Sequence, residues 1–259
     1  MAKNSLTEQA TSSLPLQIVT QSTSKPRKAR ERVKPIFKQI VKHKLKKVAR
    51  PTLQEENRVG YPRLRVAGVD EVGRGCIAGP VVAGAVLLPA VVDYVSEPWL
   101  LEVTDSKALV AAVRERLAPK IWGWALSAAI GLATVEEIDQ INIFHASHLA
   151  MLRAVDALLI RPQQLLIDGK FLPKKGLSIP ASAIIQGDLK SLSIACGSII
   201  AKVWRDRLMV ELDREFPGYG LAGHKGYPTP EHVRALRANG VLKIHRRSFR
   251  PVAVTLLNP

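Results

Sequence analysis

The feature that most constrains this chain is an apolar run that ends in two adjacent carboxylates. Residues 66–69 have the β-branched and small side chains of a buried strand, and Asp70 and Glu71 follow directly. Two carboxylates at the end of a buried strand are costly unless something compensates their charge. A metal ion, a salt-bridge partner and a shared proton are the three ways in which this can happen.

Two further strand-like runs end in an acid, at Asp168 and at Asp188. Residues just beyond the carboxyl ends of neighbouring parallel strands converge on one crevice, so we expect these acids to join Asp70 and Glu71. For Asp188, capping of the following helix is an open alternative. An oxygen-only set suits Mg²⁺ or Mn²⁺ rather than Zn²⁺. Two such ions, roughly 3.5–4 Å apart, can promote hydrolysis of a phosphodiester.

A glycine-bracketed arginine, Gly73-Arg74-Gly75, follows the acid pair. Successive strand residues face opposite sides, so Asp70 and Glu71 can share a site only if the chain turns between or just after them. The two glycines supply such a turn. Their spacing does not match a dinucleotide-binding loop. Exposed backbone amides beside an arginine suit a phosphate or sugar of a nucleic acid.

The positive charge is concentrated near the N-terminus. The net charge is +16, and residues 21–50 hold twelve basic side chains and one acid, Glu31. We expect residues 1–60 to form a basic, disordered arm and residues 61–259 to form the folded domain. An amphipathic helix within the arm, a solvated tail, a nucleic-acid-binding arm and a targeting segment all remain open. If the arm binds phosphates, its deletion should weaken the affinity of the protein for its substrate and flatten the dependence of that affinity on salt.

The cysteines and the apolar segments favour a cytoplasmic protein without a membrane span. Cys76 and Cys196 lie far apart and lack metal-ligand spacing, which favours two buried free thiols over a disulfide. The apolar segment 76–92 is interrupted by Gly and Pro and is short for a membrane helix. We expect a buried strand with flanking turns there.

From about residue 64 onward, the pattern is typical of an α/β domain. The strands are expected at residues 64–70, 81–88, 123–132, 165–169 and 183–188. The helices are expected at about residues 106–119, 134–162, 190–215 and 229–239. The second of these helices begins with a capping box, and one face of it is marked by Ile141, Phe144, His148, Leu152, Val155 and Leu159.

Six motifs occur in an order that resembles a known family. They are the run 68–75, Asp105-Ser106-Lys107, Ile167-Asp168-Gly169, Gly187-Asp188, Ala201-Lys202-Val203 with Arg205-Asp206, and residues 224–229. Over about residues 64–253 the chain closely resembles bacterial ribonuclease HII. The resemblance implies a ribonuclease-H-like α/β fold with a mixed five-stranded sheet flanked by helices.

The resemblance also implies an activity and a division of roles. The expected activity is endonucleolytic cleavage of RNA in RNA–DNA hybrids and at ribonucleotides embedded in duplex DNA, in replication and ribonucleotide excision repair, by a monomer. Two Mn²⁺ or Mg²⁺ ions would be held by Asp70, Glu71, Asp168 and Asp188. Gly73, Arg74, Gly75 and Tyr227 would recognise the ribose 2′-hydroxyl, the group that distinguishes RNA from DNA. Lys107 would hold a phosphate.

The chain departs from the family pattern in two places. Gly197, in Ala195-Cys196-Gly197-Ser198, stands inside a helix where family members usually have alanine, which predicts a stability cost of up to ~1 kcal/mol. Leu221 replaces a more usual aromatic residue, which predicts a looser loop. Two histidines on one helix, His145 and His148, lack a third ligand and are expected on its surface.

A basic cluster near the C-terminus allows two interpretations, a phosphate track or a solvated face. Its members are His224, His245, Arg246 and Arg247. Two other functions remain open for the whole chain. A ribonuclease HIII would share the fold, but it usually has lysine in place of Arg74. A non-catalytic basic RNA-binding protein would work through its N-terminal arm.

Overall fold

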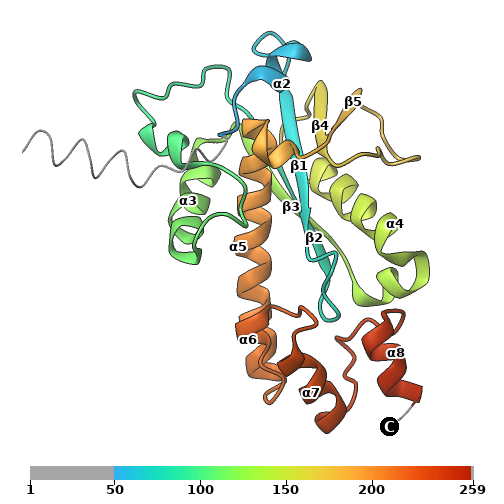
Figure 1. Cartoon of the computed structure of the whole chain (residues 1–259). Helices are drawn as coiled ribbons and strands as arrows, with labels where there is room; N and C mark the ends of the chain where they lie inside the picture. Colours follow the sequence, from blue (N-terminus) through green and yellow to red (C-terminus); the bar gives the residue numbers. More distant parts are fainter. Residues whose placement is uncertain (1–49, 258–259) are drawn as a thin grey trace, which may run out of the picture. The chain divides into compact units, whose positions relative to one another are not determined.

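The computed structural model describes residues 50–257, and the expected arm up to residue 49 lies outside them. The described part lies within one compact unit that is built on a single five-stranded sheet with the order β3-β2-β1-β4-β5 (Figure 1). The strands are β1 (Val66–Val72), β2 (Val81–Leu87), β3 (Ser127–Ala133), β4 (Gln164–Asp168) and β5 (Ala181–Ile184).

The sheet is mixed, as the family resemblance implies. β1 pairs antiparallel with β2, and β2 pairs antiparallel with β3. β4 and β5 continue the sheet on the other side of β1 as parallel neighbours. Every residue of β2 is buried, because helices cover both faces of the sheet there. The expected α/β architecture is therefore confirmed.

Two long helices cover the two faces of the sheet (Figure 1). α4 packs on β1, β2 and β3, while α5 packs on β1 and β2 from the other side and carries α3 on its outer surface. The helices are α2 (Gln54–Arg58), η1 (Pro98–Glu102), α3 (Ala111–Trp124), α4 (Val135–Asp156), η2 (Gly187–Leu189), α5 (Leu192–Glu215), α6 (Leu221–His224), α7 (Pro230–Asn239) and α8 (Arg250–Leu257).

The buried face of α4 differs from the expected one. The predicted capping box at Thr134 is present, but Leu159 is 95 % exposed and lies beyond the end of the helix. Val155 is buried as expected, but the rest of the buried face combines Ile138 and Met151 with small residues. The small residues lie at the closest approach, where a Cβ on Gly131 of β3 would lie 2.2 Å from the nitrogen of Ala154 and 2.3 Å from the carbonyl oxygen of Ala150. A backbone kink at Asn142, with a φ of 62°, further shifts the helical register. Where α4 lies closest to β3, the helix therefore needs small residues, which the pattern of large apolar residues did not indicate.

A similar close approach overturns the expectation for Gly197. A Cβ on this residue would lie 2.7 Å from the carbonyl oxygen of Gly84 in β2. The reverse substitution fails too, because a Cβ on Gly84 would lie 2.3 Å from the oxygen of Gly197. The glycine lets α5 lie directly on the sheet, so it supports the packing rather than weakening the helix.

Helix boundaries account for two further corrections. Pro119 lies inside α3, which continues to Trp124, whereas the sequence predicted that the helix stops at this proline. The strand that follows starts at Ser127 instead of residue 123, since α3 continues to Trp124 and a bend at residues 125–126 follows it. α4 ends at Asp156, before the proline that was expected to end it. The predictions for α5 and α7 are confirmed.

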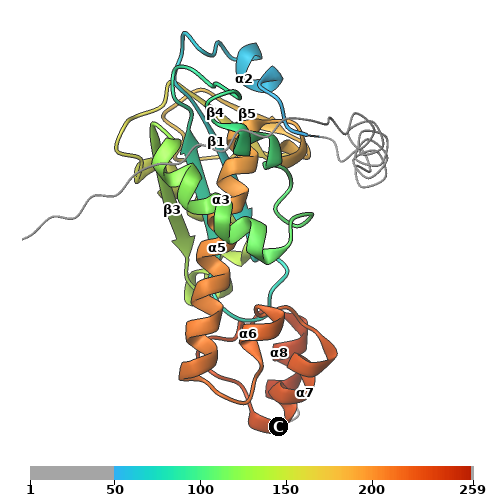
Figure 2. The same ribbon diagram turned by 90° about the vertical axis from the view of Figure 1, so that its left-hand side faces the viewer.

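The three C-terminal helices gather at the end of the sheet where β1 turns into β2 (Figure 2). Ala78 of this turn pairs with His245, and Ile77 donates its backbone N–H to Gly226. Leu221 is fully buried against Met209 and its neighbours, so the leucine does not loosen this region as the sequence predicted.

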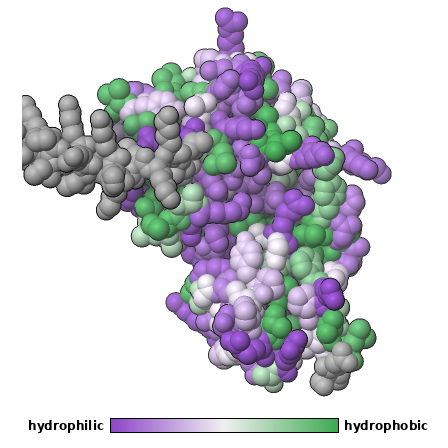
Figure 3. All heavy atoms as spheres, in the orientation of Figure 1, coloured by the Kyte–Doolittle hydropathy of each residue, from purple (hydrophilic) through white to green (hydrophobic). Residues whose placement is uncertain are grey.

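Residues 50–60, which we assigned to the arm, include a short helix attached to α5. Glu56 of α2 is fully buried, and its Oε1 atom accepts hydrogen bonds from Ser191 Oγ at 2.6 Å and from Ser193 N at 2.9 Å. Both cysteines are free and buried, as predicted. Between residues 50 and 257, no helix has the length and apolarity needed to cross a membrane. The face shown in Figure 3 is mainly hydrophilic.

Candidate functional site

The strand register brings two of the predicted acids side by side. Val69 of β1 is the partner of Ile167 in the parallel strand β4, so the next residues along, Asp70 and Asp168, are neighbours. Both side chains belong to the face on which Gly68 contacts Ser193 of α5. Asp70 is only 3 % exposed. Two carboxylates thus meet where β4 ends, under the first turns of α5.

Glu71 belongs to the opposite face of the strand by alternation. β1 runs on to Val72, so the turn follows the acid pair and does not separate the two acids. The Glu71 carboxylate receives a hydrogen bond from Arg74 Nη1 at 3.3 Å. It remains close enough to Asp168 for that carboxylate to act on its pKa. Glu71 therefore borders the same acid cluster, just beyond the C-terminal end of β4.

Asp188 enters the cluster from the turn η2, just before α5. Ser191 caps α5 by accepting from the backbone of Ile194, so the helix-cap alternative for Asp188 is excluded. Gly187 N donates to Asp168 Oδ1 at 2.6 Å, which fixes η2 against the end of β4. Lys107 Nζ lies 3.9 Å from Asp188 Oδ2. The four predicted acids, with Lys107, are therefore brought together.

Burial and mutual repulsion dominate the electrostatics of these acids. Burial raises the pKa of Asp70 well above its ordinary value, and the charges of Glu71 and Asp168 raise it further. Burial likewise raises the pKa of Asp188 to about 6, with contributions from Asp105 and Asp168. Burial disfavours the charged form of Lys107, but the neighbouring carboxylates outweigh it and raise the pKa of this ammonium group. The cluster carries more negative charge than its own neighbours compensate.

This donor set fits a hard divalent cation. It offers only oxygen ligands, and its central carboxylate is buried where an opposite charge is most stabilising. As they are arranged between residues 50 and 257, no three or more His, Cys, Asp or Glu side chains lie close enough together to hold a metal ion. The acids thus form an electrostatic cluster that a cation has to draw together.

Hydroxyl groups form hydrogen bonds that fix Asp70 and the segment before Lys107. Ser198 of α5 hydrogen-bonds the carboxylate of Asp70, which partly offsets the effect of burial on its pKa. The hydroxyls of Ser198 and Ser106 lie 2.9 Å apart, so they join α5 to the segment that precedes Lys107. Sequence reasoning assigned no role to either serine.

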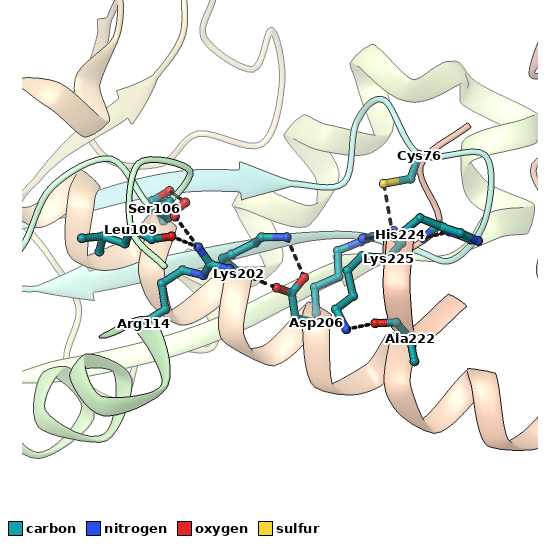
Figure 4. A network of polar contacts seen from close by, with 12 residues as sticks. Cys76, Ser106, Leu109, Arg114, Lys202, Asp206, Ala222, His224 and Lys225 are labelled. Carbon is teal, nitrogen blue, oxygen red and sulfur yellow. Dashed lines mark hydrogen bonds and ion pairs between the residues drawn. The ribbon is translucent and has the colours of Figure 1, made fainter. Parts of the chain in front are cut away.

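The same segment is anchored from α3 and α5 (Figure 4). Arg114 Nη1 donates to the carbonyl oxygen of Ser106 at 2.8 Å and also to that of Leu109. Asp206 lies 3.7 Å from Arg114 Nη2 and accepts from Lys202 Nζ at 2.6 Å. This network fixes the backbone from which Lys107 reaches the acids.

The glycine–arginine loop and Tyr227 also meet. A Cβ on Gly75 would lie 3.8 Å from the Tyr227 ring, and Tyr227 is 38 % exposed. The fully buried Arg205 lies beneath the loop and donates to the carbonyl oxygens of Pro80, Lys225 and Ala78 at 3.0, 2.8 and 3.0 Å. Its guanidinium thus joins the segment before Tyr227 to the segment after Gly75.

Gly73 is required at its position. Its φ is +93°, and a Cβ would lie 2.3 Å from Nε of Arg205. The predicted turn after the acid pair is therefore made by Gly73. Its backbone conformation disfavours any other residue, and there is no room for a Cβ.

The basic cluster near the C-terminus is mostly structural. Arg246 and His245 are buried, so neither an open phosphate track nor a solvated face describes them, and only Arg247 is exposed. Arg246 donates to Gly79 O at 2.9 Å and to Arg74 O at 3.1 Å, because its guanidinium crosses beneath the glycine loop. Burial and the nearby charge of Arg205 lower its pKa to about 10.

A chain of neutral imidazoles supports Tyr227. Leu242 N donates to His245 Nδ1, so the other ring nitrogen of His245 carries the proton and donates to His232 Nε2 at 3.2 Å. His232 Nδ1 then donates to the carbonyl oxygen of Tyr227 at 2.9 Å. Burial lowers the pKa of both His232 and His245 to about 4. His232 was not singled out by the sequence.

Comparison with known proteins shows the family. The model of the family described as Ribonuclease HII matches residues 67–252. Ribonuclease HII of Myxococcus xanthus is 49 % identical over 220 residues, which cover 78 % of this chain and 72 % of that protein. Ribonuclease HII of Ruegeria pomeroyi is 54 % identical over 191 residues, with 73 % and 77 % covered.

Solved structures agree with this fold. Ribonuclease H2 of Pyrococcus horikoshii is 29 % identical with a TM-score of 0.62, covering 74 % of this chain and 97 % of its own. Bst-RNase HIII in complex with Mn²⁺ is 21 % identical with a TM-score of 0.57, covering 75 % and 70 %, and this likeness shows the fold alone. With its mixed sheet and its family match over most of the folded residues, the chain belongs to the ribonuclease HII family.

Proposed function

We propose that this enzyme hydrolyses the RNA strand of RNA–DNA hybrids and cuts at ribonucleotides embedded in duplex DNA, with a divalent cation held by Asp70, Glu71, Asp168 and Asp188. One observation carries this proposal: the acid cluster borders the loop formed by residues 73–75 through the bond between Glu71 and Arg74. A group that can hold cations and a group that can read a sugar therefore share one surface.

The reaction is a phosphodiester hydrolysis. The oxygen of a water forms a bond to phosphorus, and the bond from phosphorus to the 3′-oxygen breaks. The 3′-oxygen takes up a proton and leaves as a hydroxyl, so the products carry 3′-hydroxyl and 5′-phosphate ends. Bound Mg²⁺ or Mn²⁺ supplies the activation of the water and the stabilisation of the leaving group. The relative solved with Mn²⁺, Bst-RNase HIII, supports this class of cation.

The side chains of this enzyme bind and orient the substrate. Lys107 is exposed and points its ammonium group toward Asp188, so it can hold a phosphate beside the acids. The backbone of Gly73 and Gly75 and the side chain of Arg74 can contact the ribose 2′-hydroxyl. The half-exposed ring of Tyr227 lies against Gly75 and can pack on the next sugar.

The experiment is a cleavage assay on duplex DNA that contains one ribonucleotide. We expect Mg²⁺-dependent cutting at that position, no cutting of the all-DNA duplex, and loss of cutting in Asp168→Asn. Efficient cutting of the single-ribonucleotide duplex also separates this function from a ribonuclease HIII, for which a long hybrid is the better substrate. Cutting that survives Asp168→Asn would remove the acid cluster from the chemistry.

The N-terminal arm and the assembly state belong to this proposal as well. Deletion of residues 1–49 is expected to weaken substrate binding and to flatten its salt dependence, because each phosphate contact releases counterions. An unchanged salt slope would show that the arm does not bind phosphates. We further expect a monomeric, cytoplasmic enzyme, and light scattering on the purified full chain checks the first point.

A further inference from the structure

A cluster of aromatic and basic side chains lies beside the acid cluster and has no role in the proposed reaction. We call it the aromatic patch. It is formed by α4 and by the connection between β4 and β5, which run next to each other (Figure 1). Its members are Phe144, His145, His148, Lys170, Phe171, Lys174 and Lys175.

The rings of the aromatic patch form one connected surface. Phe144 contacts His148 and Phe171 edge to face, with centroids 4.6 and 6.0 Å apart. Phe171 is 56 % exposed although it is a large apolar side chain. Burial lowers the pKa of His148, so this ring is held in its neutral form. The patch therefore offers ring faces to solvent rather than to the core.

The charges around these rings are positive and are not paired within the protein. Lys170 Nζ lies 5.5 Å from the centroid of the Phe171 ring. Lys174 and Lys175 border the rings and are exposed. Across residues 50–257, none of these three lysines takes part in an ion pair. An exposed ring beside unpaired ammonium groups suits a base attached to a phosphate chain.

The patch also contains a hollow of small size. Its volume is ≈ 260 Å³, and it is lined by His145, His148, Leu149, Leu152, Pro173, Lys174 and Lys175. This is below the roughly 300–1,000 Å³ of sites for drug-sized ligands. A flat group such as one nucleobase fits within this volume, and the imidazole and aliphatic side chains around it suit the face of a base. Phe144 and Phe171 do not line the hollow but adjoin it through His148, which Phe144 contacts.

The patch continues the site already described. Phe171 follows Asp168 by three residues, and its backbone hydrogen-bonds His148. The charge of Arg74 acts on the pKa of His148, which places the glycine–arginine loop near the rings. A nucleic-acid strand bound at the acids can therefore extend over the patch.

We infer that the aromatic patch binds an unpaired nucleotide of the substrate, with its base against Phe171 and the α4 histidines and its phosphates facing the three lysines. This rests on the proposed function, since the strand is held at the acid cluster. Bases within a duplex stack on each other, so only an unpaired base can present its face to the rings. Stacking of this kind tolerates any base.

The test compares KM for RNA–DNA hybrids that are blunt or that carry a short unpaired extension at one end of the cut strand, each end in turn. In the wild-type enzyme, an extension at one of the two ends is expected to lower KM about tenfold, the effect of one stacked base. Phe171→Ala is expected to abolish this gain and to leave KM for the blunt hybrid unchanged. Lys174→Glu is expected to act in the same direction.

Trp122→Ala is the matched control, because Trp122 is 45 % exposed but lies on α3, outside the patch. It is expected to keep the tenfold gain. Equal KM values for blunt and extended hybrids in the wild type would overturn the inference while leaving the proposed function intact. A rise in KM of Phe171→Ala on both substrates would also overturn it, by showing a contact to the duplex. Absence of any cutting by the wild type would instead refute the proposed function.

Discussion

The acid cluster and the glycine–arginine loop adjoin each other, yet the buried charged groups at the two places differ in the partners that the protein gives them. The acids repel one another, and both burial and this repulsion raise the pKa of Asp70. The loop lies over two buried arginines, Arg205 and Arg246, which donate to backbone carbonyls, although Nη2 of Arg246 has no partner. Arg205 alone makes three such bonds, to Pro80, Lys225 and Ala78.

This difference indicates that the loop and the acid cluster have different tasks. The loop is organised by hydrogen bonds within the protein, so we propose that it meets the ribose without rearrangement. The acid cluster is left with excess negative charge, and a cation from solution can complete it. We therefore expect changes in the acids to affect chemistry more than folding, and changes beneath the loop to affect folding first.

The largest effect is expected for Asp70→Asn. The variant should lose more than ~10²-fold in kcat, since even groups that only support a metal ligand contribute 10–100-fold. Its fold should be retained, because the substitution removes charge from a buried cluster of like charges. Asp156→Asn, at the exposed end of α4, is the control and should cut normally. Equal kcat in both variants would contradict the division of work.

The next largest effect is expected beneath the loop, for Arg205→Lys. Lysine keeps the charge but cannot make three directed bonds, so we expect a loss of about 3 kcal/mol in the free energy of unfolding. For a domain of this size the melting temperature should fall by about 6–12 °C. Arg207→Lys, two residues along α5 on the exposed surface, should cost less than about 1 kcal/mol. Similar melting temperatures for the two variants would show that the loop is not held by Arg205.

Gly197→Ala tests how closely α5 must approach the sheet that carries the acids. We expect a loss of about 1–3 kcal/mol from overpacking against Gly84, despite the better helix propensity of alanine. Gly123→Ala in α3 is the matched control, because a Cβ there would contact nothing within 4 Å. It should gain up to about 1 kcal/mol. Stabilisation by both alanines in urea denaturation would refute the packing argument.

At neutral pH the smallest effect is expected for the two buried histidines, whose influence on stability appears only as the pH falls. His232 and His245 have a pKa of about 4 in the folded protein, below the ordinary 6.5, because burial disfavours their charged forms. The unfolded chain therefore takes up protons first, and stability is lost as pH falls from about 6.5 toward 4. His232→Gln should make this fall in melting temperature shallower. Parallel curves for variant and wild type would contradict the assigned protonation states.

The main strands, two helix starts and the meeting of the acids could be predicted from the local sequence. Acids that follow apolar runs indicated the strands, and parallel pairing then placed Asp70 beside Asp168. Only Asp168 ends its strand as expected, because β1 continues to Val72 and β5 ends at Ile184, which leaves Asp188 in the turn η2. The caps at Thr134 and Thr229 indicated where two helices begin. These features were predictable because each depends on a few consecutive residues and on one rule of sheet geometry.

The parts that could not be predicted depend on contacts between distant segments. Nothing near Arg246 in the sequence indicates that its guanidinium is buried against Gly79, 167 residues away. The role of Gly197 depends on Gly84 in another strand, and helix propensity alone gives the wrong sign. The buried face of α4 includes small residues that the apolar pattern did not indicate, since Ala154 lies against Gly131 of another element.

The most direct test of the account is thermal unfolding of the wild type and Asp70→Asn with increasing Mn²⁺. Without Mn²⁺, Asp70→Asn should melt at the higher temperature, because it lacks one of the mutually repelling charges. With Mn²⁺, the wild-type melting temperature should rise with the logarithm of the Mn²⁺ concentration, while that of the variant should stay nearly constant. Equal stabilisation of both proteins by Mn²⁺, or of neither, would contradict the claim that a cation completes the acid cluster.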